Sequence, residues 1–143
     1  MLQGHYYQAA DTFSSALVFH RNDSDTNLAK SLALFAAGEY MSASYFLDRS
    51  ITLNPQSLRL PLDLTAFLPD PNLISNRLDD LEYWQKQTGQ SILLFLEGYI
   101  QYRLNDLPAA KASLARANQF QPETASIETL LNVVSEVLKG EQN

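Results

Sequence analysis

A chain of 143 residues with 45% hydrophobic residues has the size of one domain and enough apolar side chains for a real core. Its net charge of −6 argues against a nucleic-acid or anionic-membrane surface, because such surfaces need clustered lysines and arginines. The absence of cysteine excludes disulfides, thiol nucleophiles and cysteine-ligated metal sites, and no apolar run approaches the roughly 20 residues that span a bilayer.

The first predicted element is a helix within residues 1–21, with small side chains at Ala9 and Ala16 on either side of Phe13. Spacings of four and three place these side chains on one helix face, which a neighbouring helix can approach closely. The sequence before them has no helix to cover this face. We therefore expect either a piece of a longer protein or a homodimer that buries Ala9, Phe13 and Ala16.

Residues 24–55 are predicted to form two antiparallel helices, with a turn at Gly38 between them and Pro55 after the second. The second helix repeats the small–large–small spacing, with the side chains of Ala43, Leu47 and Ser50. This pair of helices can therefore pack closely along one face.

Residues 57–90 include the stretch LPLDLTAFLPDPN, which holds three of the chain's six prolines. We predict a degenerate helix pair, with Pro61 in the first turn of a helix near 58–68. Asp70 is predicted to cap a second helix near 71–88. The apolar stripe of that second helix is predicted to contain Ile74, Leu78, Leu81 and Trp84. Because this pair lacks small residues, its helices should pack further apart and bend the structure locally.

Residues 91–122 are predicted to form another antiparallel pair, with Gly98 near the middle of its first helix and a turn at Asn105. The small–large–small spacing returns in the second helix of this pair, at Ala110, Leu114 and Ala117. Residues 124–140 are predicted to form an amphipathic capping helix that stops at Gly140, because a stack of helix pairs otherwise exposes its last apolar face.

These pairs resemble the tetratricopeptide repeat family. Ala43 follows Ala9 by 34 positions, and Ala110 follows Ala43 by 67, one short of twice 34. The residues that carry the resemblance are Gly38, Tyr40, Ala43, Pro55, Gly98, Ala110 and Pro122. The resemblance implies an all-α, right-handed superhelix of antiparallel helix pairs; an irregular all-α domain is the alternative. The LPLDL run and the proline–aspartate start are similar to a variant unit of Gram-negative bacteria, which implies a bacterial cytoplasm or periplasm.

The resemblance also implies a protein-interaction scaffold, because in that family the first helix of each pair lines a concave, peptide-binding face. The expected peptide-binding residues are Leu28, Leu32, Phe35, Phe95, Tyr99, Tyr102 and Arg103. In family members that bind the acidic C-termini of chaperones, lysines occupy the positions of Leu28 and Phe95. We therefore expect the partner here to be an apolar helix or an extended peptide instead. The other interpretation is that these aromatic side chains are buried against residues 57–90.

The sequence offers little for catalysis or metal binding. His5 and His20 lie fifteen positions apart, too far along one helix to share a metal ion. The stretch DSDTN at 23–27 resembles the start of a calcium loop, but Leu28 replaces the required glycine, so we interpret it as a helix cap. No phosphate-binding glycine loop, nucleophile elbow or HExxH pattern is present. We expect no enzyme, no cofactor and no metal site.

Overall fold

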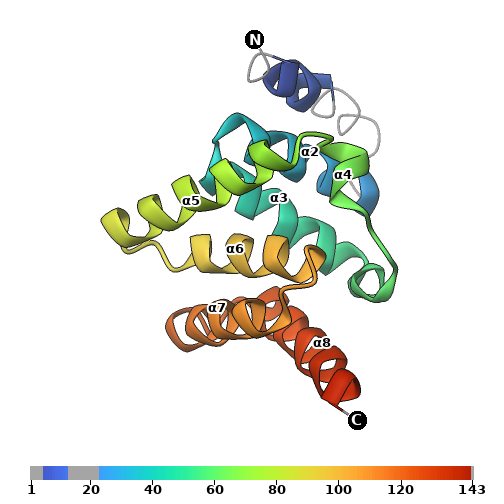
Figure 1. The fold of residues 1–143 in the computed structure, drawn as a ribbon, viewed down its shortest axis with the longest axis vertical. Helices are drawn as coiled ribbons and strands as arrows, with labels where there is room; N and C mark the ends of the chain where they lie inside the picture. Colours follow the sequence, from blue (N-terminus) through green and yellow to red (C-terminus); the bar gives the residue numbers. More distant parts are fainter. Residues whose placement is uncertain (1–4, 13–22, 143) are drawn as a thin grey trace.

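The computed structural model describes residues 5–12 and 23–142, and every regular element within these ranges is a helix (Figure 1). Residues 5–12 form the first helix. The elements after it are α2 (Ser24–Ala37), α3 (Tyr40–Leu53), the 3-10 helix η1 (Pro55–Arg59), α4 (Leu64–Phe67), α5 (Pro71–Thr88), α6 (Ile92–Arg103), α7 (Leu107–Phe120) and α8 (Ala125–Gln142). The all-α prediction is confirmed for the described residues.

Helices α2 and α3 form the first antiparallel pair. Asp23 caps α2, and its side chain accepts a hydrogen bond from the backbone N–H of Asp25 at 3.1 Å, so the predicted cap is confirmed. Gly38 ends α2 with a φ of 87°, a left-handed turn conformation that glycine adopts without strain. Between the helices, the hydroxyl of Ser31 donates to the backbone oxygen of Ala43 at 2.7 Å, which is close packing through small side chains.

Helices α6 and α7 form a second pair with even closer contact. A Cβ atom added at Gly98 would lie 2.5 Å from Cγ of Leu114, well inside van der Waals distance. The turn between the helices contains Asn105 in the left-handed conformation, with a φ of 64°. The predicted small–large–small side chains of α7 are all fully buried: Ala110, Leu114 and Ala117.

The two pairs adjoin directly, because α3 packs against α6 (Figure 1). Helix α8 follows α7 and also contacts α3, and it buries Ile127, Leu130 and Val134. The prediction that this last helix stops at Gly140 is wrong, since α8 continues to Gln142. Glycine weakens a helix interior by only about 1 kcal/mol, which is too little by itself to end a helix.

The segment before α5 differs from its prediction. The single helix expected near 58–68 is wrong: η1 ends at Arg59, α4 begins at Leu64, and Pro61 lies in the non-helical stretch between them. Leu60 is extended, with φ −82° and ψ 142°, as expected for a residue before proline, whose ring disfavours the helical conformation there. Asp63 then starts a new helical turn by accepting the backbone N–H of Thr65 at 2.9 Å.

Helix α5 begins and ends as predicted. The side chain of Asp70 accepts the backbone N–H of Asn72 at 2.9 Å, and Gly89 ends the helix in a left-handed conformation. The helix packs against α2 and α6, the first helices of the two pairs. Nε of Arg77 donates to the backbone oxygen of Ala36 at 2.7 Å, which ties α5 to the end of α2.

Residues 58–81 contribute six buried side chains to the core. Their buried side chains are Leu58, Leu64, Leu68, Leu73, Ile74 and Leu81. These side chains belong to the same apolar cluster as the buried aromatic residues of α2 and α6. Burial of a leucine or isoleucine side chain stabilises a fold by about 1.5–3 kcal/mol, so this segment contributes substantially to holding the two helix pairs together.

The helix at residues 5–12 lies against the first pair. Ala10 is buried, Ala9 is half-buried against the core, and the hydroxyl of Tyr7 donates to the Glu39 carboxylate at 2.6 Å. Ala9 therefore contacts this chain's own core. Phe13, Ala16 and His20 lie outside the described residues, so the predicted dimer face is described only at Ala9.

Candidate protein-interaction site

The residues predicted to bind a peptide lie in or beside the core. The five buried members are Leu28, Leu32, Phe35, Phe95 and Tyr99, and the two half-buried members are Tyr102 and Arg103. They come from α2 and α6, the two helices that α5 contacts. This burial agrees with the second interpretation of the sequence, in which the chain's own residues 57–90 cover these aromatic side chains.

Tyr102 and Arg103 bind a segment of the same chain. The Tyr102 hydroxyl donates to the backbone oxygen of Leu58 at 2.6 Å. Nη1 and Nη2 of Arg103 donate to the backbone oxygens of Leu60 and Ser57 at 2.8 and 3.2 Å. These bonds satisfy the carbonyl groups of Leu58 and Leu60, where no continuous helix is present to do so, and add a second donor to Ser57, which already accepts the backbone N–H of Leu60.

Tyr99 supports this arrangement from the core. Nε of Arg103 donates to the Tyr99 hydroxyl at 3.1 Å, so all three guanidinium nitrogens of Arg103 have partners. Burial raises the pKa of the Tyr99 hydroxyl, which therefore stays neutral at physiological pH and accepts the bond. Tyr102 and Arg103 thus hold an irregular segment of this chain, with Tyr99 orienting the guanidinium group.

The predicted residues of α2 also line cavities next to α4. Leu28 lines a cavity of about 580 Å³ between α2 and residues 61–67. Leu32 lines a neighbouring cavity of about 260 Å³, and Phe67 and the helix at residues 5–12 line the same cavity. Both cavities therefore lie between α2 and the segment that carries α4.

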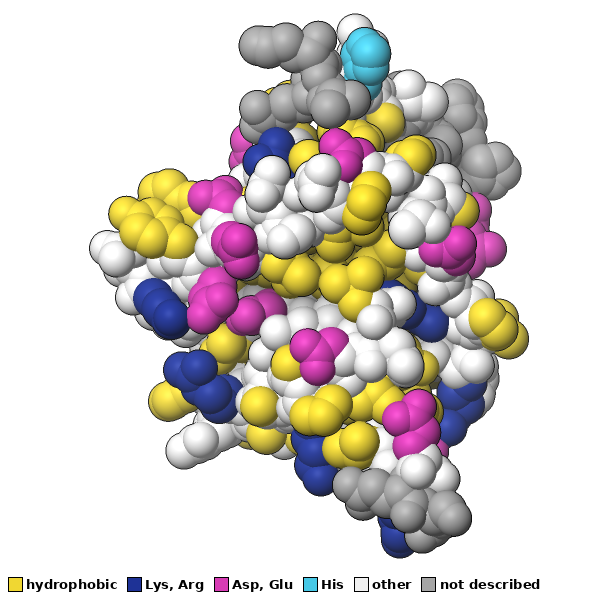
Figure 2. All heavy atoms as spheres, viewed as in Figure 1, with side chains coloured by type: hydrophobic (Ala, Val, Ile, Leu, Met, Phe, Trp, Pro, Cys, Tyr) yellow, Lys and Arg dark blue, Asp and Glu magenta, His cyan; other side chains and the backbone are white. Residues whose placement is uncertain are grey.

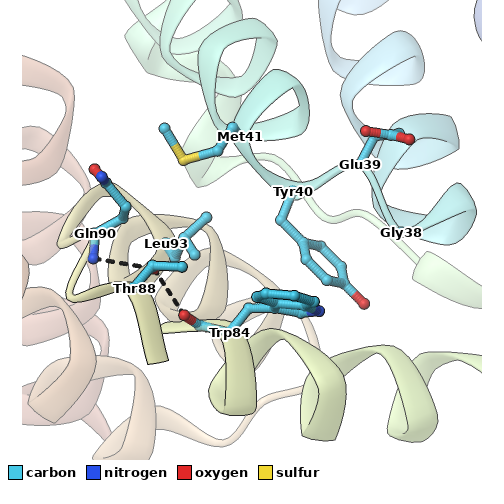
Figure 3. Close-up of a pocket in the computed structure, with 8 residues that line it drawn as sticks. All are labelled: Gly38, Glu39, Tyr40, Met41, Trp84, Thr88, Gln90 and Leu93. Carbon is cyan, nitrogen blue, oxygen red and sulfur yellow. Dashed lines mark hydrogen bonds between the residues drawn. The ribbon is translucent and has the colours of Figure 1, made fainter. Parts of the chain in front are cut away.

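A separate pocket lies at the other end of α5, where the start of α3 and the start of α6 meet it (Figure 3). We name it the Trp84 pocket; its lining residues are Gly38, Glu39, Tyr40, Met41, Trp84, Thr88, Gln90 and Leu93. Its volume of about 230 Å³ lies below the roughly 300–1,000 Å³ of most small-molecule sites. A pocket of this size suits a single side chain of a partner.

The walls of the Trp84 pocket are largely apolar and exposed. Met41, Leu93 and Trp84 line this pocket from α3, α6 and α5 (Figure 3). Met41 is 52% exposed and Trp84 is 47% exposed, so both side chains are accessible to a partner. Tyr83, also exposed, makes an edge-to-face contact with the Trp84 ring at 5.7 Å between centroids. Large aromatic side chains in such positions are typical of protein-interaction sites.

Hydrogen bonds fix the walls of the pocket. The hydroxyl of Thr88 donates to the backbone oxygen of Trp84 at 2.7 Å, and the backbone N–H of Gln90 donates to that hydroxyl at 3.3 Å (Figure 3). The Tyr40 hydroxyl donates to the Asp80 carboxylate at 2.6 Å, which orients the Tyr40 ring. These bonds hold the Thr88 and Tyr40 side chains in the wall of the pocket.

Acidic side chains lie near the Trp84 pocket, and Figure 2 shows several of them beside the apolar cluster at this end of α5. Glu39 lines the pocket, and Asp79, Asp80 and Glu82 lie on α5 before Trp84. Burial raises the pKa of the nearby Glu97 carboxyl, and the negative charge of Glu82 raises it further.

The sequence does not single out Trp84 as a binding residue, because its spacing assigns it to the apolar stripe of α5, which we expected to face the core. Ile74 and Leu81 are buried and Leu78 is half-buried, so the stripe is confirmed over most of the helix. At Trp84 the prediction is wrong. A continuous apolar stripe on α5 does not show where the helices packed against it end. The signal in the sequence that could have indicated the site is the adjacent pair Tyr83 and Trp84, with Asp79 and Asp80 one turn earlier.

Other functional groups were sought among the described residues. No three histidine, aspartate or glutamate side chains of residues 5–12 and 23–142 lie close enough together to hold a metal ion. Within the same ranges, no helix has both the length and the apolar character needed to cross a membrane. Comparison of the chain with protein-family models, curated proteins and solved structures gives no match.

Proposed function

We propose that this chain is a tetratricopeptide-like protein-interaction module that binds its partner at the Trp84 pocket. The repeat resemblance is supported by the two adjoining helix pairs, by their turns at Gly38 and Asn105, and by the close contact at Gly98. Residues 57–60 of the chain itself occupy part of the face that was predicted to bind a peptide. We therefore assign the interaction to the Trp84 pocket instead.

The observation that carries the proposal is the pair of large apolar side chains, Met41 and Trp84, exposed on the wall of a pocket. Tryptophan and tyrosine are enriched among the residues that dominate binding energy at protein interfaces, especially in pockets. Truncating such a residue typically weakens binding by 2 kcal/mol or more, which is about thirtyfold.

The test is affinity capture from a lysate of the source organism, with the full chain immobilised and captured proteins quantified by mass spectrometry. We expect Trp84→Ala and Met41→Glu to lose the partner that the unmodified chain retains. Leu60→Ala is the matched control, because Leu60 is also exposed, at 62%, but lies beyond the opposite end of α3. Circular dichroism verifies that each variant is folded. Equal capture by Trp84→Ala and Leu60→Ala would contradict the proposal.

A further inference from the structure

We propose that the Trp84 pocket receives an apolar side chain from a basic segment of a different protein. This inference rests on the proposed interaction function and adds the chemical class of the partner. The pocket would bind the apolar side chain of the partner, and the carboxylates beside it would attract the basic residues on either side of that side chain.

The preference for an apolar side chain follows from the lining. The side chains of Met41, Trp84 and Leu93 give the pocket three apolar walls, and its volume of about 230 Å³ accommodates one large side chain. Methionine adapts to differently shaped neighbours because its side chain is flexible and polarisable. A leucine, methionine or phenylalanine of the partner is therefore the expected anchor.

The preference for a basic partner follows from the positions of the acidic residues on α5. Asp79 and Asp80 each lie four residues before an exposed aromatic side chain, Tyr83 and Trp84 respectively, and residues four apart are neighbours on a helix surface. A partner whose apolar side chain contacts the rings would place flanking residues over these carboxylates. Lysine or arginine at those flanking positions is favoured, and glutamate or aspartate is repelled.

The cations near the pocket offset only part of this charge. Lys86 forms an ion pair with Glu82 at 3.0 Å, so it balances one carboxylate of α5. Arg77, whose Nε donates to the backbone oxygen of Ala36, also lies near the Tyr40 hydroxyl and balances a second carboxylate, that of Asp80. Glu39 at the pocket and Asp79 add further negative charge. The surface around the pocket is therefore acidic.

The same charge argues against other occupants. A second copy of this chain would bring another net charge of −6 and the same acidic surface, which oppose association. Nucleic acids and anionic membranes are disfavoured for the same reason. A basic segment of another protein is the occupant that satisfies both the apolar walls and the acidic surroundings.

The test uses synthetic peptides with one central leucine flanked on both sides by lysines, by serines or by glutamates. Trp84 is the single tryptophan of the chain, so its fluorescence and its indole N–H signal in NMR spectra report on the pocket itself. We expect the lysine peptide to shift the indole signal and to bind about tenfold more weakly at 1 M than at 0.01 M sodium chloride, since the screening length falls from about 30 Å to about 3 Å.

Three comparisons make the result decisive. Replacing the central leucine by serine should remove the shift, and the glutamate peptide should give none. The variant Asp79→Asn should weaken binding of the lysine peptide several-fold, whereas Asp106→Asn, which removes the same charge beyond the other end of α6, should not. Equal, salt-independent binding of the serine and lysine peptides would overturn the basic-partner inference and leave the interaction function standing. The capture experiment with Trp84→Ala tests that function separately.

Discussion

Substitution of Gly98 by alanine tests the packing of α6 against α7. The added Cβ would meet three atoms of one side chain, at 2.5, 2.8 and 3.3 Å from Cγ, Cδ2 and Cδ1 of Leu114. Leu114 is fully buried, so its side chain has little room to move away. Overpacking costs about 1–3 kcal/mol, whereas alanine gains about 1 kcal/mol over glycine in a helix interior. We expect Gly98→Ala to destabilise the fold by up to about 2 kcal/mol.

The sign of this effect should reverse when Leu114 is shortened. Leu114→Ala removes the three atoms that the new Cβ would meet, and on its own it costs about 2–5 kcal/mol. In that background, Gly98→Ala should stabilise the fold by about 1 kcal/mol, because helix propensity remains and the clash is gone. The coupling energy between the two substitutions is then about 1–3 kcal/mol, the cost of the overpacking itself.

Urea denaturation of the four proteins in this cycle measures the coupling. Gly140→Ala in α8 is the matched control, because nothing lies within 4 Å of a Cβ added there. It should be neutral or stabilising by up to about 1 kcal/mol. A stabilising Gly98→Ala in the unmodified chain, or a coupling energy near zero, would refute the close approach of α6 and α7.

Two further substitutions test Arg103 and Glu97. Arg103→Met should destabilise the fold by about 2 kcal/mol, because it leaves backbone carbonyls of residues 57–60 without their charged donors, and limited proteolysis should then cut this segment faster. Burial raises the pKa of Glu97 above its ordinary 4.5, so the folded state binds the proton more tightly and Glu97 lowers stability as the pH rises above 4.5. Thermal melting should therefore find Glu97→Gln more stable than the unmodified chain at pH 7, with the difference shrinking toward pH 4.

The outcomes that contradict these two predictions are specific. Unchanged proteolysis of residues 57–60 in Arg103→Met would mean that the segment is held by Leu58 and its apolar contacts alone. A stability difference for Glu97→Gln that is the same at pH 4 and pH 7 would mean that the effect does not come from ionisation of the carboxyl group.

The helix pairs were predictable because their signals are local. Gly38 and Asn105 mark turns, Asp70 and Gly89 mark the ends of α5, and small residues at spacings of four and three mark the packed faces. Each of these signals acts within one or two helical turns. The structure follows these signals in the two helix pairs and in α5, whereas the local stop signal at Gly140 does not end α8.

The candidate site was less predictable because distant parts of the chain decide it. The burial of Phe95 and Tyr99 depends on where α5 and residues 55–68 pack, and the leucines of that segment fit a continuous helix as well as the broken one that forms. Trp84 is exposed because of where the neighbouring helices end. Neither fact is contained in the local pattern, so the binding face and the pocket required the tertiary structure.

The proposal that a partner binds at the Trp84 pocket is tested by titrating the full chain with the lysine-flanked peptide. NMR spectra should follow the signals of Trp84 and of residues 102–103 in the same titration. We expect the Trp84 indole signal to shift, while the backbone signals of Tyr102 and Arg103 stay in place because residues 57–60 are bound there. Shifts at Tyr102 and Arg103 with no change at Trp84 would place the partner on the face that the repeat resemblance predicted, and would contradict binding at the Trp84 pocket.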